Sequence, residues 1–265
     1  MIILSVKNLS KQYGHTTVLD RLDFEVEQGK VVSIVGPNGA GKSTLFDLWT
    51  GFTSPDRPHN KAEDINEGIG KTTIFDLVGG FVEAERGKIF FKGQDITRMS
   101  PEERAGLGIS RTFQQIGLFK ELTVLENLAL VAPISGLGWW KRLFSVRVAE
   151  QVALEKVGHL LEKFGLSDRL NMPAGKLSTG QQRLLEIIRA VMLPHELLLL
   201  DEPTAGLNPV ARERIAELLG ELKGTNDTVV IIEHDMEFVR VVSDLVYRLE
   251  GGKLEKQNKK RRPSK

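Results

Sequence analysis

The sequence predicts an α/β fold around a mostly parallel sheet, and two observations support this prediction. Apolar strand candidates alternate with amphipathic helix candidates, as in the successive segments 196–203, 209–224 and 228–235. Earlier in the chain, the glycine-rich stretch "GPNGAGKST" (36–44) directly follows "KVVSIVG", an apolar run dense enough for a strand that is covered on both faces.

The remaining elements follow from the same periodicities. "ILSVKNL" and "LDFEVEQG", near the start of the chain, alternate apolar and polar residues and predict half-buried antiparallel strands. Further strands are expected at 87–93 and 245–254, and a further helix at 181–193. Between about 116 and 176 apolar residues recur at helical spacing, which predicts a helical insert.

Composition excludes several classes of function. The chain has 265 residues, 41% of them hydrophobic, and a formal charge of +1, which is ordinary for a soluble protein and argues against a polyanionic partner. It has no cysteine, which excludes disulfides, thiol catalysis and cysteine metal sites and suits a cytoplasmic protein. The start has no signal-peptide pattern, and no apolar run approaches the ~18 residues of a membrane span.

Two segments have two readings each. The basic end "KQNKKRRPSK" is either a solvated, disordered tail, which is the favoured reading, or a contact for anionic lipid or a partner. Trp139 and Trp140, inside the helical insert, either pack internally or mark a contact surface.

The stretch at 36–44 carries the clearest chemistry, because it fits the phosphate-loop pattern G-x-x-x-x-G-K-[ST]. Its glycines let backbone N–H groups turn inward on phosphates. Lys42 would reach the β- and γ-phosphates and the Ser43 hydroxyl would coordinate Mg²⁺, while the following helix points its positive end at the anion.

The chain contains a second copy of this loop and helix. "GAGKSTLFDLWTGF" (39–52) and "GIGKTTIFDLVGGF" (68–81) are identical at nine of fourteen positions, at an offset of 29 residues. The second copy has Ile65 in place of the leading glycine, and the segment before it is polar and proline-containing, with no strand to anchor a loop. Lys71 is therefore predicted not to be catalytic, although the helix of the copy can still form.

Residues 53–81 are interpreted as a duplicated insertion, with three readings. The favoured one is a tolerated surface insertion, because loop length costs little free energy. The others are an added contact surface for a partner, and two helices that compete for one docking site. If Lys71 is not catalytic, Lys42→Ala abolishes nucleotide hydrolysis while Lys71→Ala leaves most of it.

Two further stretches carry polar residues at the ends of predicted elements. "LLLLDEP" delivers Asp201 to the carboxyl edge of the sheet, where a nucleotide's Mg²⁺ would lie, and places Glu202 to orient or deprotonate a water. "KLSTGQQRLLEIIRA" (176–190) begins a helix whose N-cap is Ser178 or Thr179. The start of that helix is either only a cap or also an exposed anion-binding site, and the residues alone favour neither interpretation.

Together these stretches resemble the ATP-binding cassette (ABC) family of transport ATPases over about residues 3–253. "LSTGQ" is similar to the family signature and "LLLLDEP" to its Walker B strand. "IIEHD" carries His234 at the switch-histidine position, "RTFQ" carries Gln114 at the Q-loop position, and "KQYG" supplies Tyr13 as an adenine-stacking aromatic. Without the resemblance, the sequence leaves two interpretations of His234, which stands between Glu233 and Asp235. It is either a metal ligand or a histidine at a strand end whose hydrogen bonds are satisfied within the fold.

The resemblance implies a P-loop NTPase (RecA-like) core with an antiparallel β subdomain and an inserted α-helical signature subdomain. The expected division is a nucleotide-binding core at 1–115 and 177–254, a helical subdomain at 116–176 and a basic tail at 255–265.

The resemblance also implies the cofactors ATP and Mg²⁺ and a role for each motif residue. The catalytic residues would be Glu202, His234, Lys42 and Gln114, and the metal ligands Ser43, Gln114 and Asp201. Nucleotide binding would involve Tyr13, Gly36, Asn38, Gly39, Ala40, Gly41, Lys42, Ser43, Thr44, Ser178, Gly180 and Gln181.

In this family the signature of one subunit closes over ATP bound to the other, so Ser178 and Gly180 would act in trans in a head-to-tail homo- or heterodimer. The implied partners are a membrane permease and, indirectly, an external solute-binding protein, at the cytoplasmic face of the membrane and without nucleic acid. "GISRTFQ", "LFKELTVLENL" and "DEPTAGLNP" resemble cassettes of branched-chain amino-acid importers and their urea- or amide-importing relatives.

Three other functions remain as alternatives. A soluble cassette acting on DNA or ribosomes would keep the ATPase, but the chain shows no large basic face. A regulatory nucleotide binder would be expected to lack Glu202 or His234. A small-molecule or nucleoside kinase would explain the phosphate loop and leave "LSTGQ" and "IIEHD" unexplained.

Overall fold

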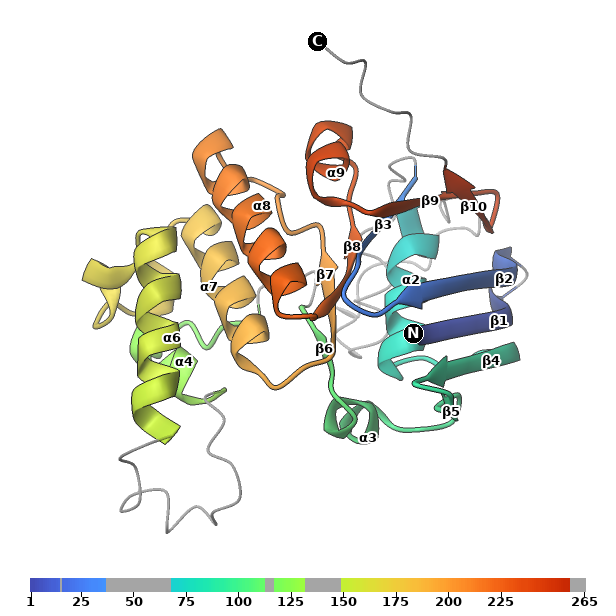
Figure 1. Ribbon diagram of the computed structural model, residues 1–265, viewed down its shortest axis with the longest axis horizontal. Coiled ribbons are helices and arrows are strands. Elements are labelled where there is room, and N and C mark those ends of the chain that lie inside the picture. The colour runs from blue at the N-terminus through green and yellow to red at the C-terminus, as the bar shows by residue number, and fades with distance from the viewer. Residues whose placement is uncertain (15, 37–67, 113–116, 132–148, 258–265) are drawn as a thin grey trace, which may run out of the picture.

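The computed structural model describes residues 1–14, 16–36, 68–112, 117–131 and 149–257, and the structural statements below concern these residues. They form two sheets with helices around and between them (Figure 1). No helix in these ranges is long and apolar enough to cross a membrane.

The central sheet has six strands, and its neighbours pair in parallel except at one edge. β3, β7 and β8 are buried along their whole length, which confirms the prediction of strands covered on both faces. β10 pairs antiparallel with β9 and closes that edge. In spatial order the strands are β10 (Lys253–Gln257), β9 (Leu245–Glu250), β3 (Val31–Val35), β8 (Thr228–Ile232), β7 (Leu197–Asp201) and β6 (Ile109–Arg111).

The second sheet is antiparallel, as the alternating pattern at the start of the chain predicts. Leu4 and Val6 of its long first strand are buried, while Lys7 is exposed. The strands in spatial order are β2 (Thr16–Glu27), β1 (Ile2–Tyr13), β4 (Arg86–Phe91) and β5 (Gln94–Asp95).

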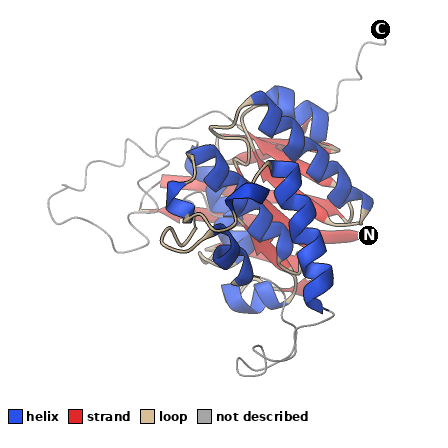
Figure 2. Cartoon of the chain, turned by 90° about the vertical axis from the view of Figure 1, so that its left-hand side faces the viewer, coloured by secondary structure: helices blue, strands red, loops and turns tan. Residues whose placement is uncertain are grey.

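A layer of helices covers one face of the central sheet (Figures 1 and 2). Alternate residues of the central strands, such as Leu198 and Leu200, face this layer and share one apolar core with it. The neighbouring Leu197 and Leu199 face the opposite side. The helices are α4 (Val124–Ala129), α6 (Ala149–Phe164), α7 (Thr179–Met192), α8 (Pro209–Gly224) and α9 (Met236–Val242), with two short 3₁₀ turns at Ser167–Arg169 and Ala174–Lys176.

The opposite face of the central sheet is covered by α2 (Gly68–Gly79), which lies between the two sheets (Figure 1). Ile74, Phe75, Leu77 and Val78 of this helix are each 1% exposed and pack in one core with β3 and the antiparallel sheet. The helix of the second copy therefore forms, as predicted. The favoured reading of residues 53–81 as a surface insertion is wrong for this helix, because its apolar side is fully enclosed; residues 53–67 lie outside the described residues.

The structure departs from the predicted elements at other places too, among them the end of the chain and residues 101–106. The single strand expected at 245–254 is two strands, β9 and β10, separated by Gly251 and Gly252 with φ of 56° and 75°. The predicted tail at 255–265 is wrong up to Gln257, because that turn folds the chain back to pair with β9; residues 258–265 lie outside the described residues. α3 (Pro101–Gly106) was not predicted, although Ser100 and Glu103 form a capping box at its start.

Candidate functional site

The end of β7 buries an acidic side chain that lacks a full set of partners. Asp201 is 1% exposed, and its Oδ2 accepts no hydrogen bond from the described residues. Its backbone N–H donates to Thr112 Oγ1 at 3.1 Å, which fixes the strand end. Burial raises the pKa of the Asp201 carboxyl to about 6, and the nearby positive charge of Arg111 works against this rise.

This carboxylate fits the ligand role that was predicted for Mg²⁺. The described residues hold no group of three or more histidine, aspartate or glutamate side chains that would form a complete metal cage. Mg²⁺ in nucleotide sites needs no such cage, because one or two protein oxygens share it with phosphates and water. An unpartnered buried oxygen on Asp201 is suited to that arrangement, while the other predicted ligands, Ser43 and Gln114, lie outside the described residues.

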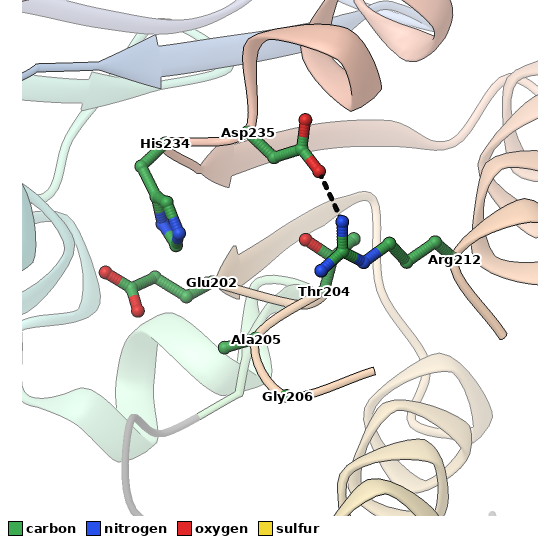
Figure 3. A pocket seen from close by; sticks show the side chains of 7 residues that line it. All are labelled: Glu202, Thr204, Ala205, Gly206, Arg212, His234 and Asp235. Atoms are coloured by element: carbon green, nitrogen blue, oxygen red, sulfur yellow. Dashed lines mark hydrogen bonds and ion pairs between the residues drawn. The ribbon is translucent and has the colours of Figure 1, made fainter. Parts of the chain in front are cut away.

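Glu202 follows Asp201 with φ of 46°, a backbone conformation that is uncommon outside glycine and often found at functional sites. Its N–H donates to Ile232 O at 2.9 Å, which holds the turn against the next strand. The side chain borders an open pocket of about 450 Å³. Figure 3 shows the Glu202 carboxylate and the His234 ring next to one another on one side of this pocket. The pocket is lined by Glu202, Thr204, Ala205, Gly206, Arg212, His234 and Asp235.

Glu233, fully buried beside the pocket, joins the loops after β7 and β8. Its Oε1 accepts from the backbone N–H of Thr204 at 3.0 Å and from Thr204 Oγ1 at 2.6 Å. Its Oε2 accepts from the backbone N–H of His234 at 3.0 Å. The His234 side chain remains 41% exposed toward the pocket, with Nδ1 3.8 Å from Glu233 Oε2.

The metal-ligand reading of His234 gains no support from its acidic neighbours. Both oxygens of Glu233 accept hydrogen bonds from the two loops. Asp235 caps α9 by accepting from the N–H groups of Glu237 and Phe238, and its other oxygen pairs with Arg212 at 2.8 Å. These carboxylates hold the loops in place, and the imidazole of His234 lines the pocket without belonging to any metal-binding group of three or more such side chains among the described residues.

The start of α7 confirms the cap reading of "LSTGQ" and leaves the anion-site reading a prediction. Ser178 is the N-cap and forms a capping box with Gln181: Ser178 Oγ accepts from Gln181 N–H at 3.3 Å, and Gln181 Oε1 accepts from Ser178 N–H at 3.1 Å. Ser178 and Thr179 are exposed, so the positive end of this helix of 14 residues faces solvent. The predicted role of Ser178 and Gly180 toward a nucleotide on another subunit stays a prediction.

Arg183, which the sequence reasoning missed, ties α7 to the end of β7. It is 6% exposed, and its guanidinium donates to the backbone oxygens of Asp201 and Glu202, the latter at 3.1 Å. It also pairs with Glu186 at 2.6 Å. The sequence did contain a signal for this role. Arg183 and Glu186 stand three residues apart on the apolar side of the predicted helix, and such charged groups are buried only when they are paired.

The first residue of the predicted phosphate loop, Gly36, stands at the end of β3. A Cβ at this position would lie 2.7 Å from Leu249 O, so only glycine fits. Lys71, from the second copy, is 3% exposed, and its Nζ donates to Gly36 O at 3.0 Å. The hydroxyl of Tyr13 is hydrogen-bonded to Thr73, also in the second copy, and Lys11 Nζ lies 5.3 Å from the centre of the Tyr13 ring.

The structure thus brings together Asp201, Glu202 and His234 in one place. Gly36 and Tyr13 both lie against α2, and Ser178, Gly180 and Gln181 form the separate exposed start of α7. The other predicted site residues lie outside the described residues and are not placed: Asn38, Gly39, Ala40, Gly41, Lys42, Ser43, Thr44 and Gln114.

Comparisons with known proteins find the same pattern along nearly the whole chain. The sequence model of the family described as ABC transporter matches residues 19–65 and 66–205. The high-affinity branched-chain amino acid transport ATP-binding protein LivG of Escherichia coli K12 is 35% identical over 256 residues, which cover 94% of this chain and 89% of LivG. BraF of Pseudomonas aeruginosa, which carries the same description, is 36% identical over the same shares of the two chains.

Solved structures agree in fold. The ADP conformation of MJ1267, an ATP-binding cassette of an ABC transporter, superposes with a TM-score of 0.71 at 33% identity. The match covers 96% of this chain and 90% of that cassette. The predicted fold class is confirmed by this likeness together with the two sheets and the helical layer.

Proposed function

This chain belongs to the ABC transporter family, as its motifs predicted, and on that premise we propose that it is the ATP-hydrolysing subunit of a membrane importer for branched-chain amino acids or a related small polar solute such as urea or amides. The observation that supports the catalytic part most directly is the arrangement at the end of β7. Glu202 and the partly exposed His234 line one pocket there, and the residue before Glu202, Asp201, buries a carboxylate whose Oδ2 accepts no hydrogen bond from the described residues.

Each of these groups has a role that follows from its surroundings. Asp201 would hold Mg²⁺, because its unpartnered oxygen needs a cation and its charge is fixed at the strand end. Bound Mg²⁺ would supply charge neutralisation at the β- and γ-phosphates. Gln114 is proposed as a further ligand from the motif pattern alone, and so is the hydroxyl residue after the phosphate-loop lysine, which is Ser43 in the first copy and Thr72 in the second.

Glu202 would orient and deprotonate the water that attacks the terminal phosphate. Its carboxylate lies at the pocket, and its backbone is held by Ile232 and Arg183, so the side chain starts from a fixed point. His234 would contact the γ-phosphate from the opposite loop, and Glu233 would hold that loop in register with Thr204.

The exposed start of α7 would complete the site of a second subunit. Ser178, Gly180 and Gln181 lie at a positive helix end that no described element covers, which suits phosphate on a facing protein. The active unit would then be a head-to-tail dimer, with itself or with a similar cassette. It would act on permease subunits at the cytoplasmic face of the membrane, and through them on an external solute-binding protein.

The test is the hydrolysis of ATP by the purified chain and by the variant Glu202→Gln. The variant is expected to bind ATP and to lose at least a hundredfold in hydrolysis, because the amide cannot accept the proton of the water. Glu213→Gln, a matched change of an exposed glutamate on α8, should leave the rate within twofold. Hydrolysis that survives Glu202→Gln would contradict the proposed role of this residue.

Coupling to a permease has a separate test. Affinity purification of the tagged chain from its native membrane is expected to recover a multi-span membrane subunit in fixed ratio. Recovery of the chain only from the fraction without membranes would favour the alternative, a cassette that is not coupled to a permease.

A further inference from the structure

We propose that the phosphate site of this chain is built on the second copy, through α2, and that Lys71 takes the role first expected of Lys42. The proposal rests on the proposed ATPase function and names the lysine and the helix that serve it. It reverses the expectation that Lys71 is not catalytic.

The position behind the phosphate loop is already filled by the second copy. Four apolar residues of α2 are each 1% exposed between β3 and the antiparallel sheet. Protein interiors are close-packed, so a position filled in this way leaves no room for a second helix. Only one of the two copies can therefore follow β3 in its core position, and the structure places Ile74, Phe75, Leu77 and Val78 there.

The side chains that differ between the copies favour the second one in this position. Val78 is enclosed, and the first copy has Trp49 at the matching place, which would overpack the core. A Cβ at Gly79 would lie 2.9 Å from Cδ2 of Phe81, and the first copy has Thr50 at that place. Two positions on the buried side and at the end of the helix thus fit the second sequence better than the first.

The end of α2 is also held by charged groups from outside the helix. Arg104, which is 2% exposed, donates to the backbone oxygens of Leu77 and Val78, the latter at 2.9 Å. Asp76 pairs with Arg111 at 2.6 Å, and Arg111 is the residue of β6 that stands opposite Leu199 of β7. The helix is therefore linked through Arg111 of β6 to β7, the strand that ends at Asp201.

The objection that the second copy lacks a strand and a leading glycine is answered by Gly36. Lys71 Nζ donates to Gly36 O at 3.0 Å, so the lysine of the second copy already reaches the residue at the end of β3. Gly36 followed by residues 66–73 supplies the residue types of G-x-x-x-x-G-K-[ST], and 29 residues of the chain separate the two parts. The family match divides between residues 65 and 66, so that each of its two stretches contains one copy of the loop and helix.

A second contact places the second copy beside another proposed ligand-binding residue. The hydroxyl of Tyr13 is hydrogen-bonded to Thr73, two residues after Lys71. Tyr13 and Lys71 therefore both lie at the start of α2, whose positive end favours an anion.

The direct test compares Lys71→Met with Lys42→Met in the full chain. Both changes remove the charge and keep most of the side-chain length, which makes each a control for the other. Lys71→Met is expected to lower ATP hydrolysis at least a hundredfold, and Lys42→Met to leave it within about twofold. A large loss in Lys42→Met, alone or together with Lys71→Met, overturns the proposal. A wild-type chain that hydrolyses no ATP would instead contradict the proposed function.

Because Lys71 is buried, its variant can lose activity by unfolding, and a second measurement avoids this ambiguity. The chain has no cysteine, so Val78→Cys provides one thiol at the buried face of α2, and Val210→Cys provides an exposed control, since Val210 is 57% exposed. The Val78→Cys thiol is expected to react with a maleimide at least a hundredfold more slowly than the control until denaturant is added. Equal rates in the native protein would show that α2 does not fill this position, and would overturn the proposal.

Discussion

The guanidinium of Arg183 donates to the backbone oxygen of Glu202 at 3.1 Å, which links the helix that begins with the signature stretch to the proposed catalytic glutamate. The same guanidinium donates to Asp201 O and pairs with Glu186. Arg183 thereby ties α7 to the strand end that carries both carboxylates.

The first prediction concerns this link. Arg183→Met removes the buried cation that pairs with Glu186. Arg189 remains as a positive charge near Glu186 and compensates for part of the loss. Loss of one partner of a buried ion pair is strongly destabilising, so the free energy of unfolding should fall by about 3 kcal/mol. Urea unfolding measures this, and the double variant Arg183→Met/Glu186→Gln should recover part of the loss. A fall of less than about 1 kcal/mol would contradict the structural role assigned to Arg183.

The second prediction concerns the charge on Asp201. Burial raises its pKa from 3.8 to about 6, so between these values the folded protein binds more protons than the unfolded chain. The free energy of unfolding therefore falls as the pH rises through this window, and the full cost, roughly 3 kcal/mol, is present above pH 6.

Asp201→Asn removes this cost, so the metal-free variant should be more stable than the wild type at pH 7.5, by less at pH 5, and equally stable near pH 4. Urea unfolding with EDTA at these pH values measures the difference. A variant that is less stable at pH 7.5 would refute the burial argument. The same variant should lose Mg²⁺-dependent hydrolysis.

The third prediction concerns the core behind β3. Phe75 is 1% exposed, so Phe75→Ala should cost about 3–5 kcal/mol of the free energy of unfolding. Phe46 occupies the matching place in the first copy, and Phe46→Ala should cost less than about 1 kcal/mol if the second copy fills the core. Chemical denaturation of both variants gives the comparison, and the reverse order would place the first copy in the core.

Much of the central sheet was predictable from the sequence because its strands are buried on both faces. "LLLL" before Asp201 and "TVVII" before Glu233 leave no amphipathic alternative, and both strands form as predicted. β6 was missed because its three residues, Ile109–Arg111, are too few to show a period. The capping role of Ser178 was predictable because cap chemistry is local.

The choice between the two copies was not predictable from local sequence. The polar segment before the second copy argues against a phosphate loop there only if each loop needs a strand of its own. β3 can serve either copy, and the outcome depends on how Val78 and Gly79 fit a core assembled from distant strands. Glu233 shows the same limit: its role depends on Thr204, which is 29 residues away in the chain.

The number of nucleotide sites per chain tests these conclusions most directly, and titration calorimetry of Mg²⁺–ATP into the Glu202→Gln variant measures it. One shared strand and one filled helix position predict one ATP bound per chain. That binding should persist when Lys42→Met is added and be lost when Lys71→Met is added. Two ATP molecules per chain, or binding that is lost with Lys42→Met and kept with Lys71→Met, would contradict the assignment of the site to the second copy.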